Sequence, residues 1–212
     1  MRLASKGKQT AQHAKNVGSP DLLNALVVAS YGRHFLARDA EGEIWQVYGK
    51  GKRRDVAVGD EISILPSGDK QAWIEEIQTR RNLVYRSDAL KSKMFAANLD
   101  GVLLMLAISP PYSTELLGRT LTACKHADVP LTILFNKVDI LEGDQETLDA
   151  VEQELFEITL GEVPTHYISV TEHPQETEAL LRPLLTDKRT LILGQSGMGK
   201  STLINLLIPD AL

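Results

Sequence analysis

Eight residues close to the C-terminal end constrain the fold more than any other part of the chain. Residues 194–201 read GQSGMGKS and fit the pattern G-x-x-x-x-G-K-[ST]. The apolar residues 190–193 before the motif predict a buried strand, and residues 202–207 after it predict the start of a helix. In this strand–loop–helix context, backbone N–H groups and a helix N-terminus surround a phosphate. The motif therefore predicts a phosphate-binding loop in an α/β fold.

The expected phosphate site is the whole loop together with the residue that follows it. Glycines allow the backbone to turn so that successive N–H groups point inward. Lys200 is expected to reach the β- and γ-phosphates of a nucleotide, and the Ser201 hydroxyl is expected to ligate Mg²⁺. The alternative is a glycine-rich turn that matches the pattern by chance. The candidate residues are Gly194, Gln195, Ser196, Gly197, Met198, Gly199, Lys200, Ser201 and Thr202.

From residue 94 onward, apolar strands alternate with amphipathic helices. Residues 102–108 form a continuous apolar run, which is typical of a strand buried on both faces of a parallel sheet. The alternation predicts a doubly wound α/β domain, which we place at residues 86–212. Further strands are expected at 131–135, 165–168 and 190–193, and helices at 113–126, 145–159 and 175–186.

The second expected strand ends in Asn136-Lys137-Val138-Asp139, which matches the guanine-recognition box N-K-x-D. The Asp139 carboxylate can accept hydrogen bonds from N1–H and N2–H₂ of guanine, whereas adenine would leave it unpaired. Asn136 suits the O6/N7 edge of the base, and the aliphatic stem of Lys137 can cover the ring face. Ser169, which follows the next strand, opens a loop whose backbone can meet O6. The expected ligands are therefore GTP and GDP with Mg²⁺.

Residues 24–79 contain five short strand patterns separated by Gly, Asp and Pro, as in a small all-β barrel. We expect an OB-fold, the five-stranded barrel that binds oligonucleotides, at residues 21–85. Core burial is favoured for Phe35 and Trp73. The candidate platforms on which RNA bases could stack are Tyr31, Phe35, Trp45 and Tyr48.

Positive charge is concentrated in the N-terminal part of the chain. Residues 1–85 hold 13 Lys and Arg against 10 Asp and Glu, whereas residues 86–212 hold 10 against 18. Residues 1–20 predict a basic, disordered arm, and residues 142–181, with eleven acids and no Lys or Arg, predict a solvated surface that faces away from RNA. We expect one loop of the barrel to contact an RNA phosphate backbone through Lys50, Lys52, Arg53 and Arg54. The alternative is that this loop is a solvated turn.

Composition excludes several other classes of protein and of site. The single cysteine, Cys124, excludes a disulfide framework or a cysteine-based zinc cage within these 212 residues. No apolar run is long enough to cross a bilayer, and no signal peptide is present. We expect a cytoplasmic monomer that does not associate with membranes.

The order of the motifs is their most specific property. The guanine box precedes the phosphate loop, whereas ordinary GTPases have the reverse order, so we expect a circularly permuted P-loop GTPase domain. Together with residues 80–82 (RRN) and 96–100 (AANLD), this order resembles the RsgA/YjeQ family of ribosome small-subunit-dependent GTPases. The resemblance implies a GTP hydrolase that assists late maturation of the small (30S) ribosomal subunit, with the barrel binding its rRNA.

The chain also departs from that family, whose members continue with two switch segments and a Cys/His zinc domain. No Asp-x-x-Gly follows the phosphate loop here, and no catalytic residue is transferred. We expect a C-terminally truncated form with an incomplete parallel sheet, which binds GDP at best weakly and hydrolyses GTP little. The alternatives are a non-catalytic RNA-binding module with a degenerate nucleotide fold, and an ATP-using enzyme, against which the N-K-x-D box argues.

Overall fold

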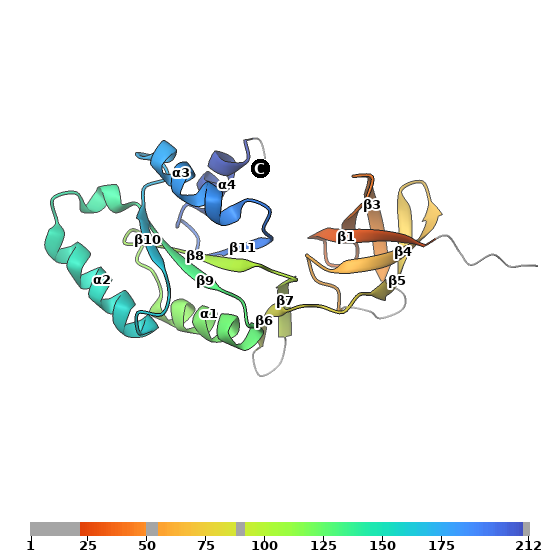
Figure 1. The fold of residues 1–212 in the computed structure, drawn as a ribbon, viewed down its shortest axis with the longest axis horizontal. Helices are drawn as coiled ribbons and strands as arrows, with labels where there is room; N and C mark the ends of the chain where they lie inside the picture. The colour runs from red at the N-terminus through yellow and green to blue at the C-terminus, as the bar shows by residue number, and fades with distance from the viewer. Residues whose placement is uncertain (1–21, 50–54, 88–91, 210–212) are drawn as a thin grey trace, which may run out of the picture.

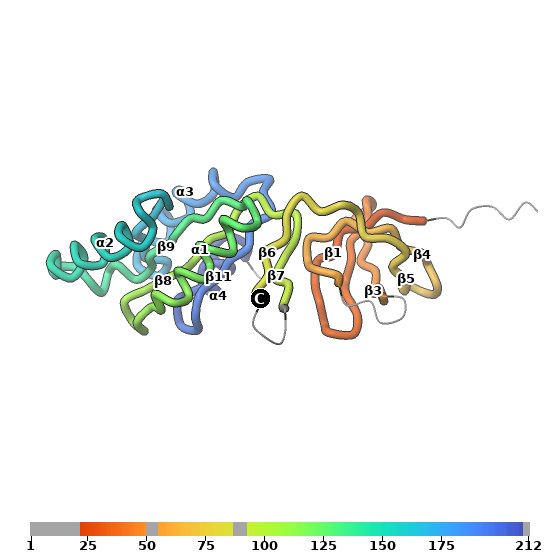
Figure 2. Tube along the Cα trace, turned by 90° about the horizontal axis from the view of Figure 1, so that it is seen from below, coloured from red at the N-terminus to blue at the C-terminus, as the bar shows by residue number. Residues whose placement is uncertain are grey.

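The computed structural model describes residues 22–49, 55–87 and 92–209 (Figure 1). A β-barrel is followed by an α/β part built on a parallel sheet, and a β-hairpin lies between them (Figures 1 and 2). The expected basic arm at 1–20 and the basic loop with Lys50, Lys52, Arg53 and Arg54 lie outside the described residues.

The barrel is closed, as the strand pattern predicted. Its strands are ordered β1-β2-β3-β5-β4, and all pairs are antiparallel except β3 with β5. Alternate residues of each strand point into the interior, where Val27, Val47 and Ile64 are at most 1% exposed. The strands are β1 (Leu23–Ser30), β2 (Phe35–Asp39), β3 (Ile44–Gly49), β4 (Glu61–Gly68) and β5 (Gln71–Ile77).

Phe35 lies in the barrel core as expected, but the prediction for Trp73 is wrong. Its neighbours Ala72 and Ile74 are fully buried, while Trp73 is 42% exposed. Successive side chains of a strand point to opposite faces, so the small Ala72 occupies the interior and the large indole lies outside. Strand register therefore places Trp73 on the outside of the barrel, although its side chain is hydrophobic.

A hairpin lies between the barrel and the sheet, where the sequence analysis predicted no strands. Strands β6 (Leu83–Ser87) and β7 (Ser92–Ala97) pair antiparallel, with Leu83 opposite Ala97. A two-stranded sheet is marginal on its own. Val84 and Ala96 attach this one to the hydrophobic core of the α/β part.

The α/β part confirms the predicted alternation of strands and helices. Its sheet has the order β10-β9-β8-β11, and every pair is parallel. Among the described strands, β11 pairs only with β8 and lies at the sheet edge, as expected for an incomplete sheet. The strands are β8 (Gly101–Ala107), β9 (Leu131–Asn136), β10 (Thr165–Ile168) and β11 (Thr190–Leu193); the helices are α1 (Thr114–Ala127), η1 (Val138–Leu141), α2 (Gln145–Thr159), α3 (Pro174–Leu185) and α4 (Lys200–Leu207).

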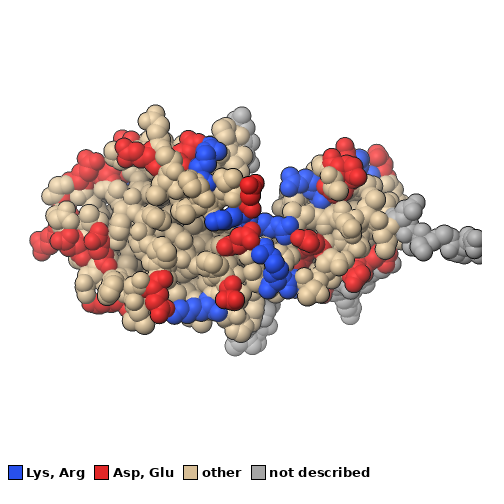
Figure 3. All heavy atoms as spheres, viewed as in Figure 1, with Lys and Arg blue, Asp and Glu red and all other residues tan. Residues whose placement is uncertain are grey.

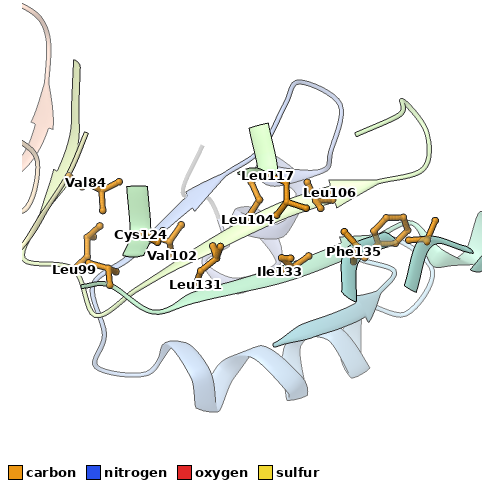
Figure 4. Packing of buried hydrophobic residues seen from close by; sticks show 14 of the residues in the cluster. Val84, Leu99, Val102, Leu104, Leu106, Leu117, Cys124, Leu131, Ile133 and Phe135 are labelled. Carbon is orange, nitrogen blue, oxygen red and sulfur yellow. The ribbon is translucent and has the colours of Figure 1, made fainter. Parts of the chain in front are cut away.

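Helices cover both faces of this sheet (Figure 1). On one face, alternate residues of β8 and β9 such as Leu104 and Ile133 pack with Leu117 of α1 (Figure 4). On the other face, Leu103 and Met105 of β8 belong to the cluster that contains α3 and α4 residues. The central strands are therefore buried on both sides, which explains their continuous apolar runs.

Polar groups join the barrel to the sheet. Asp60, which is fully buried, accepts hydrogen bonds from Arg80 and from the Ala57 N–H. The Asn98 side chain donates to the Gly59 carbonyl at 2.9 Å and accepts from the Arg81 N–H at 2.8 Å. Cations gather at this junction (Figure 3). Arg81 pairs with Asp100, and Arg189 pairs with Glu61 of the barrel. Acids are spread over the end of the molecule around α2 (Figure 3).

Candidate nucleotide-binding site

The parallel sheet brings the two sequence motifs together. The guanine box follows β9 and the phosphate loop follows β11, and β8 lies between these two strands. The carboxyl ends of parallel strands meet at one edge, where ligands of open α/β sheets bind. Residues more than 50 positions apart in the chain therefore form one site.

The phosphate loop has a backbone that only glycine allows at its tightest points. Gly199 has φ 97°, and a Cβ there would lie 2.4 Å from Nδ2 of Asn136. At Gly194, a Cβ would lie 2.5 Å from the carbonyl oxygen of Met105 in β8. The two glycines thus allow the loop to approach its neighbours closely, which side chains would prevent.

The loop leads into α4 in a way that suits an anion. The helix begins at Lys200 and its N-cap, Gly199, makes no side-chain capping bond. Uncapped N–H groups at a helix start favour negative charge. Ser201 and Thr202, in the first turn, are exposed, so the Ser201 hydroxyl is accessible to a Mg²⁺ ion bound to phosphates.

Lys200 is held close to its own loop. Its Nζ donates to the Gln195 carbonyl at 2.5 Å, which places the ammonium group over the turn instead of in solvent. The same loop buries Met198 completely, in the cluster beneath α3 and α4. Met198 therefore anchors the loop against the sheet, whereas the Lys200 contact lies within the loop itself.

Asn136 connects the phosphate loop to the segment after β10. This side chain is 3% exposed. Its Nδ2 donates to the Met198 carbonyl at 2.9 Å, and its Oδ1 accepts from the Val170 N–H at 3.1 Å. Both ends of the amide thus contact backbone, so Asn136 supports the site, whereas the sequence suggested that it faces the base.

Asp139 and Ser169 lie side by side at the other end of the site. The Ser169 hydroxyl donates to Oδ1 of Asp139 and accepts from the Glu172 N–H at 3.2 Å. Ser169 is 1% exposed, whereas Asp139 is partly exposed in η1. The buried hydroxyl orients a carboxylate that faces the solvent-accessible edge of the sheet.

Sequence reasoning missed the segment between β8 and α1, residues 109–113. The Ser109 carbonyl accepts from Nζ of Lys137 at 2.7 Å. The N–H of Ser113, the N-cap of α1, donates to Oε1 of Gln195 at 2.9 Å. This segment therefore contacts both motifs, and the signal that could have found it is its place directly after the central strand of the sheet.

Other classes of site find less support in the described part of the chain. Burial raises the pKa of the Cys124 thiol to about 11, so this cysteine is unsuited to act as a nucleophile. Within the described ranges, no group of three or more His, Cys, Asp or Glu side chains is placed to hold a metal ion. None of the helices described is long and apolar enough to cross a membrane.

Comparison with known proteins connects this geometry to a family. A sequence model of the RsgA GTPase family matches residues 77–212. A small ribosomal subunit biogenesis GTPase RsgA from Paraburkholderia phymatum is 42% identical over 198 residues, which are 92% of this chain and 61% of that relative. The chain thus spans less than two thirds of the relative's length.

Two solved structures share the fold. The crystal structure of YjeQ from Thermotoga maritima has a TM-score of 0.66 and 25% identity, covering 89% of this chain and 66% of that one. The structure of YloQ, described as a circularly permuted GTPase, has a TM-score of 0.61 and 25% identity, with 92% and 66% covered. These similarities confirm the expected fold class, a barrel followed by a permuted P-loop domain.

The contact between Gly199 and Asn136 leads to a prediction. In Gly199→Ala, the methyl group displaces the Asn136 amide and the residue is strained at positive φ, so the affinity for a fluorescent GDP analogue should fall by about 10-fold or more. Gly118→Ala is the matched control, because a Cβ at Gly118 in α1 meets nothing within 4 Å. Equal affinities for the two variants, with circular dichroism confirming that both are folded, would contradict the prediction.

Proposed function

The chain belongs to the RsgA GTPase family, and from this premise we propose that it acts as a GTP hydrolase in late maturation of the small ribosomal subunit. The reaction is GTP + H₂O → GDP + Pi. The observation that carries the nucleotide assignment is the pair of bonds by which Asn136 joins the phosphate loop to the base-binding segment. The role in maturation of the small subunit is supported by the relative from Paraburkholderia phymatum, which is named a small ribosomal subunit biogenesis GTPase.

In this proposal the phosphates bind to the N–H groups of residues 194–201 and the start of α4. Lys200 exchanges its 2.5 Å contact with the Gln195 carbonyl for the β- and γ-phosphates, where its charge is better compensated. The Ser201 hydroxyl would hold a Mg²⁺ ion, which would supply positive charge to the phosphates. Ser196, Gly197 and Thr202 line the same loop and helix start.

The base is read mainly by Asp139. Its carboxylate, oriented by Ser169, accepts from N1–H and N2–H₂ of guanine. Lys137 is anchored through Nζ to Ser109, so its aliphatic stem is available to cover the ring. Asn136 contributes by holding the phosphate loop and the Val170 backbone at a constant separation.

We assign contact with rRNA to the N-terminal half of the chain. The basic arm at 1–20, an RNA-binding barrel at 21–85 and a nucleotide-binding part at 86–212 make up the proposed organisation, although β6 crosses the last boundary. The ribosomal role in the relative's name supports the small subunit as partner and a cytoplasmic location. We also propose a monomer as the working form.

Asp139→Asn should reveal the nucleotide preference. The carbonyl oxygen of the new amide can accept one of the two guanine protons, but its NH₂ group opposes the other, so affinity for GDP should fall by about 100-fold. Xanthosine diphosphate carries an acceptor in place of the guanine N2–H₂ group and should restore binding. The control is Asp149→Asn on the exposed face of α2, and isothermal titration calorimetry is the measurement.

Two outcomes would contradict this assignment. Equal GDP affinity in Asp139→Asn and in the control would remove Asp139 from base recognition. Competition by ATP as strong as that by GTP would favour an ATP-using enzyme. In contrast, loss of GDP binding in both Lys200→Ala and Asp139→Asn would support the assignment and argue against a purely RNA-binding module.

For the polypeptide of residues 1–212 by itself, we propose weak GDP binding and little hydrolysis. No Asp-x-x-Gly follows the phosphate loop in this sequence to hold the attacking water near the γ-phosphate. Single-turnover assays with radiolabelled GTP should give a rate at least about 100-fold below that of the Paraburkholderia phymatum relative. Comparable rates would disprove the proposed impairment.

The basic loop provides the test of RNA contact. Replacing Lys50, Lys52, Arg53 and Arg54 with Ala should weaken binding to isolated small subunits and flatten its dependence on salt, because fewer counterions are released. Filter binding between about 50 and 200 mM salt measures both effects. An unchanged slope would exclude this loop from the RNA contact.

A further inference from the structure

Four aromatic rings form a continuous row on the barrel. Tyr31 stacks on His34 with ring centroids 5.2 Å apart and an angle of 17° between the planes. His34 lies 6.1 Å from Tyr48, and Tyr48 lies 5.7 Å from Trp73. We call these four residues the aromatic strip. It crosses from the turn after β1 to β3 and β5, and the pairing of β3 with β5 brings its last two rings together.

Strand register keeps the strip on the outer wall. Parallel pairing of β3 with β5 sets Tyr48 beside Trp73, while the preceding pair, Val47 and Ala72, is fully buried. Since side chains alternate along a strand, the aromatic pair faces outward. Within the described part of the chain, nothing covers Tyr31, which is 60% exposed, or Trp73, which is 42% exposed.

The turn that carries Tyr31 is held by backbone bonds. The Tyr31 N–H donates to the His34 carbonyl at 2.9 Å, and the Arg33 N–H donates to the Tyr31 carbonyl at 2.8 Å. These bonds hold the first two rings in place before any ligand arrives. A preorganised ring loses less entropy on binding than a mobile one does.

The barrel's other candidate aromatic residues are occupied. Phe35 is 6% exposed in the core. Trp45 donates through Nε1 to Asp39 at 2.7 Å, and the Lys70 ammonium lies 5.2 Å from the centre of its ring. These contacts leave the aromatic strip as the barrel surface on which a planar ligand can stack.

From these observations we propose that the aromatic strip binds unpaired bases of single-stranded RNA by stacking. The inference rests on the proposed function and specifies the form of RNA that the barrel recognises. Every base has a flat π-face, so a row of exposed rings accepts successive bases with little regard to sequence. Paired bases inside a helix hide those faces, so a duplex does not use the strip.

The charge around the strip agrees with a nucleic-acid ligand. Arg33, in the turn between Tyr31 and His34, is exposed. A cation for a phosphate beside rings for bases is the combination found in single-strand binding surfaces, whereas an apolar protein partner would need no such cation.

Tryptophan fluorescence tests the proposal directly. The chain has two tryptophans, Trp45 and Trp73, so Trp45→Phe leaves Trp73 as the reporter. Adding a single-stranded oligouridine 12-mer should quench the Trp73 emission to saturation, because stacking brings a base onto the ring. A blunt 12-base-pair RNA duplex should leave the emission unchanged at the same concentration. Quenching by the duplex that equals quenching by the single strand would overturn the proposal.

Affinity measurements then separate the strip from the fold. In the otherwise unaltered chain, Tyr31→Ala and Trp73→Ala should each weaken oligouridine binding by about 5-fold to 100-fold, the range expected for loss of one stacking partner. Tyr48→Phe, which keeps a ring, should bind as the parent does. Phe156→Ala, which removes a ring 61% exposed on α2, is the control and should have no effect.

Binding to isolated small subunits distinguishes this inference from the proposed function. We expect the strip variants to lose affinity without a change of salt slope, in contrast to the basic-loop variant. If the parent binds subunits and the strip variants bind equally well, the inference fails while the function stands. If the parent binds no subunits, the proposed function fails. If the variants lose subunit binding but keep oligouridine binding, the strip contacts a protein and the RNA proposal is overturned.

Discussion

A single buried amide, that of Asn136, joins the phosphate loop to the segment after β10 at one edge of the sheet. Asn136 ends β9 and contacts the Met198 carbonyl in the phosphate loop and the Val170 N–H after β10. A buried amide that loses its partners costs about 1–3 kcal/mol. The phosphate loop, the guanine box and the following segment are therefore stable together in one arrangement. Gly199 belongs to the same constraint, since only a residue without Cβ allows the loop to lie against Asn136.

The arrangement in turn depends on β8, the strand between the two motifs. Its backbone pairs with β9 on one side and β11 on the other, and its residues 103–106 are at most 4% exposed. The segment that follows it contributes Ser109 and Ser113 to the same edge, where they contact Lys137 and Gln195. In this permuted order, β8 is the first strand of the sheet along the chain, and the phosphate loop follows the last strand, β11. The site is therefore complete only when β11 joins the sheet.

A second set of polar contacts makes the barrel part of the same structure. Arg189, one residue before β11, donates through its backbone N–H to Asp100 and through its guanidinium group to Glu61 of the barrel. Asp60 and Arg80 add a bidentate pair at the junction. These contacts explain residues 80–82 and 96–100, which the sequence marked as a family resemblance without a physical role. They hold the barrel beside the strand that leads to the phosphate loop.

Sequence patterns by themselves predicted most elements of this protein and the two motifs of its candidate site. The helix at 145–159 and the strand at 190–193 follow from periodicity, and the parallel sheet follows from continuous apolar runs, because those signals arise from local backbone geometry. The phosphate and guanine motifs followed likewise from residue type and spacing. The hairpin β6–β7 escaped prediction because its strands depend on packing against the core of the α/β part.

Only the tertiary structure decided which way side chains face. Trp73 lies outside because the barrel register places Ala72 and Ile74 inside, and Asn136 faces backbone because the phosphate loop folds over it. Both outcomes depend on residues far away in the chain, whose positions no local pattern contains. The row from Tyr31 to Trp73 arises in the same way, because β3 and β5 are distant in the chain and become neighbours in the barrel.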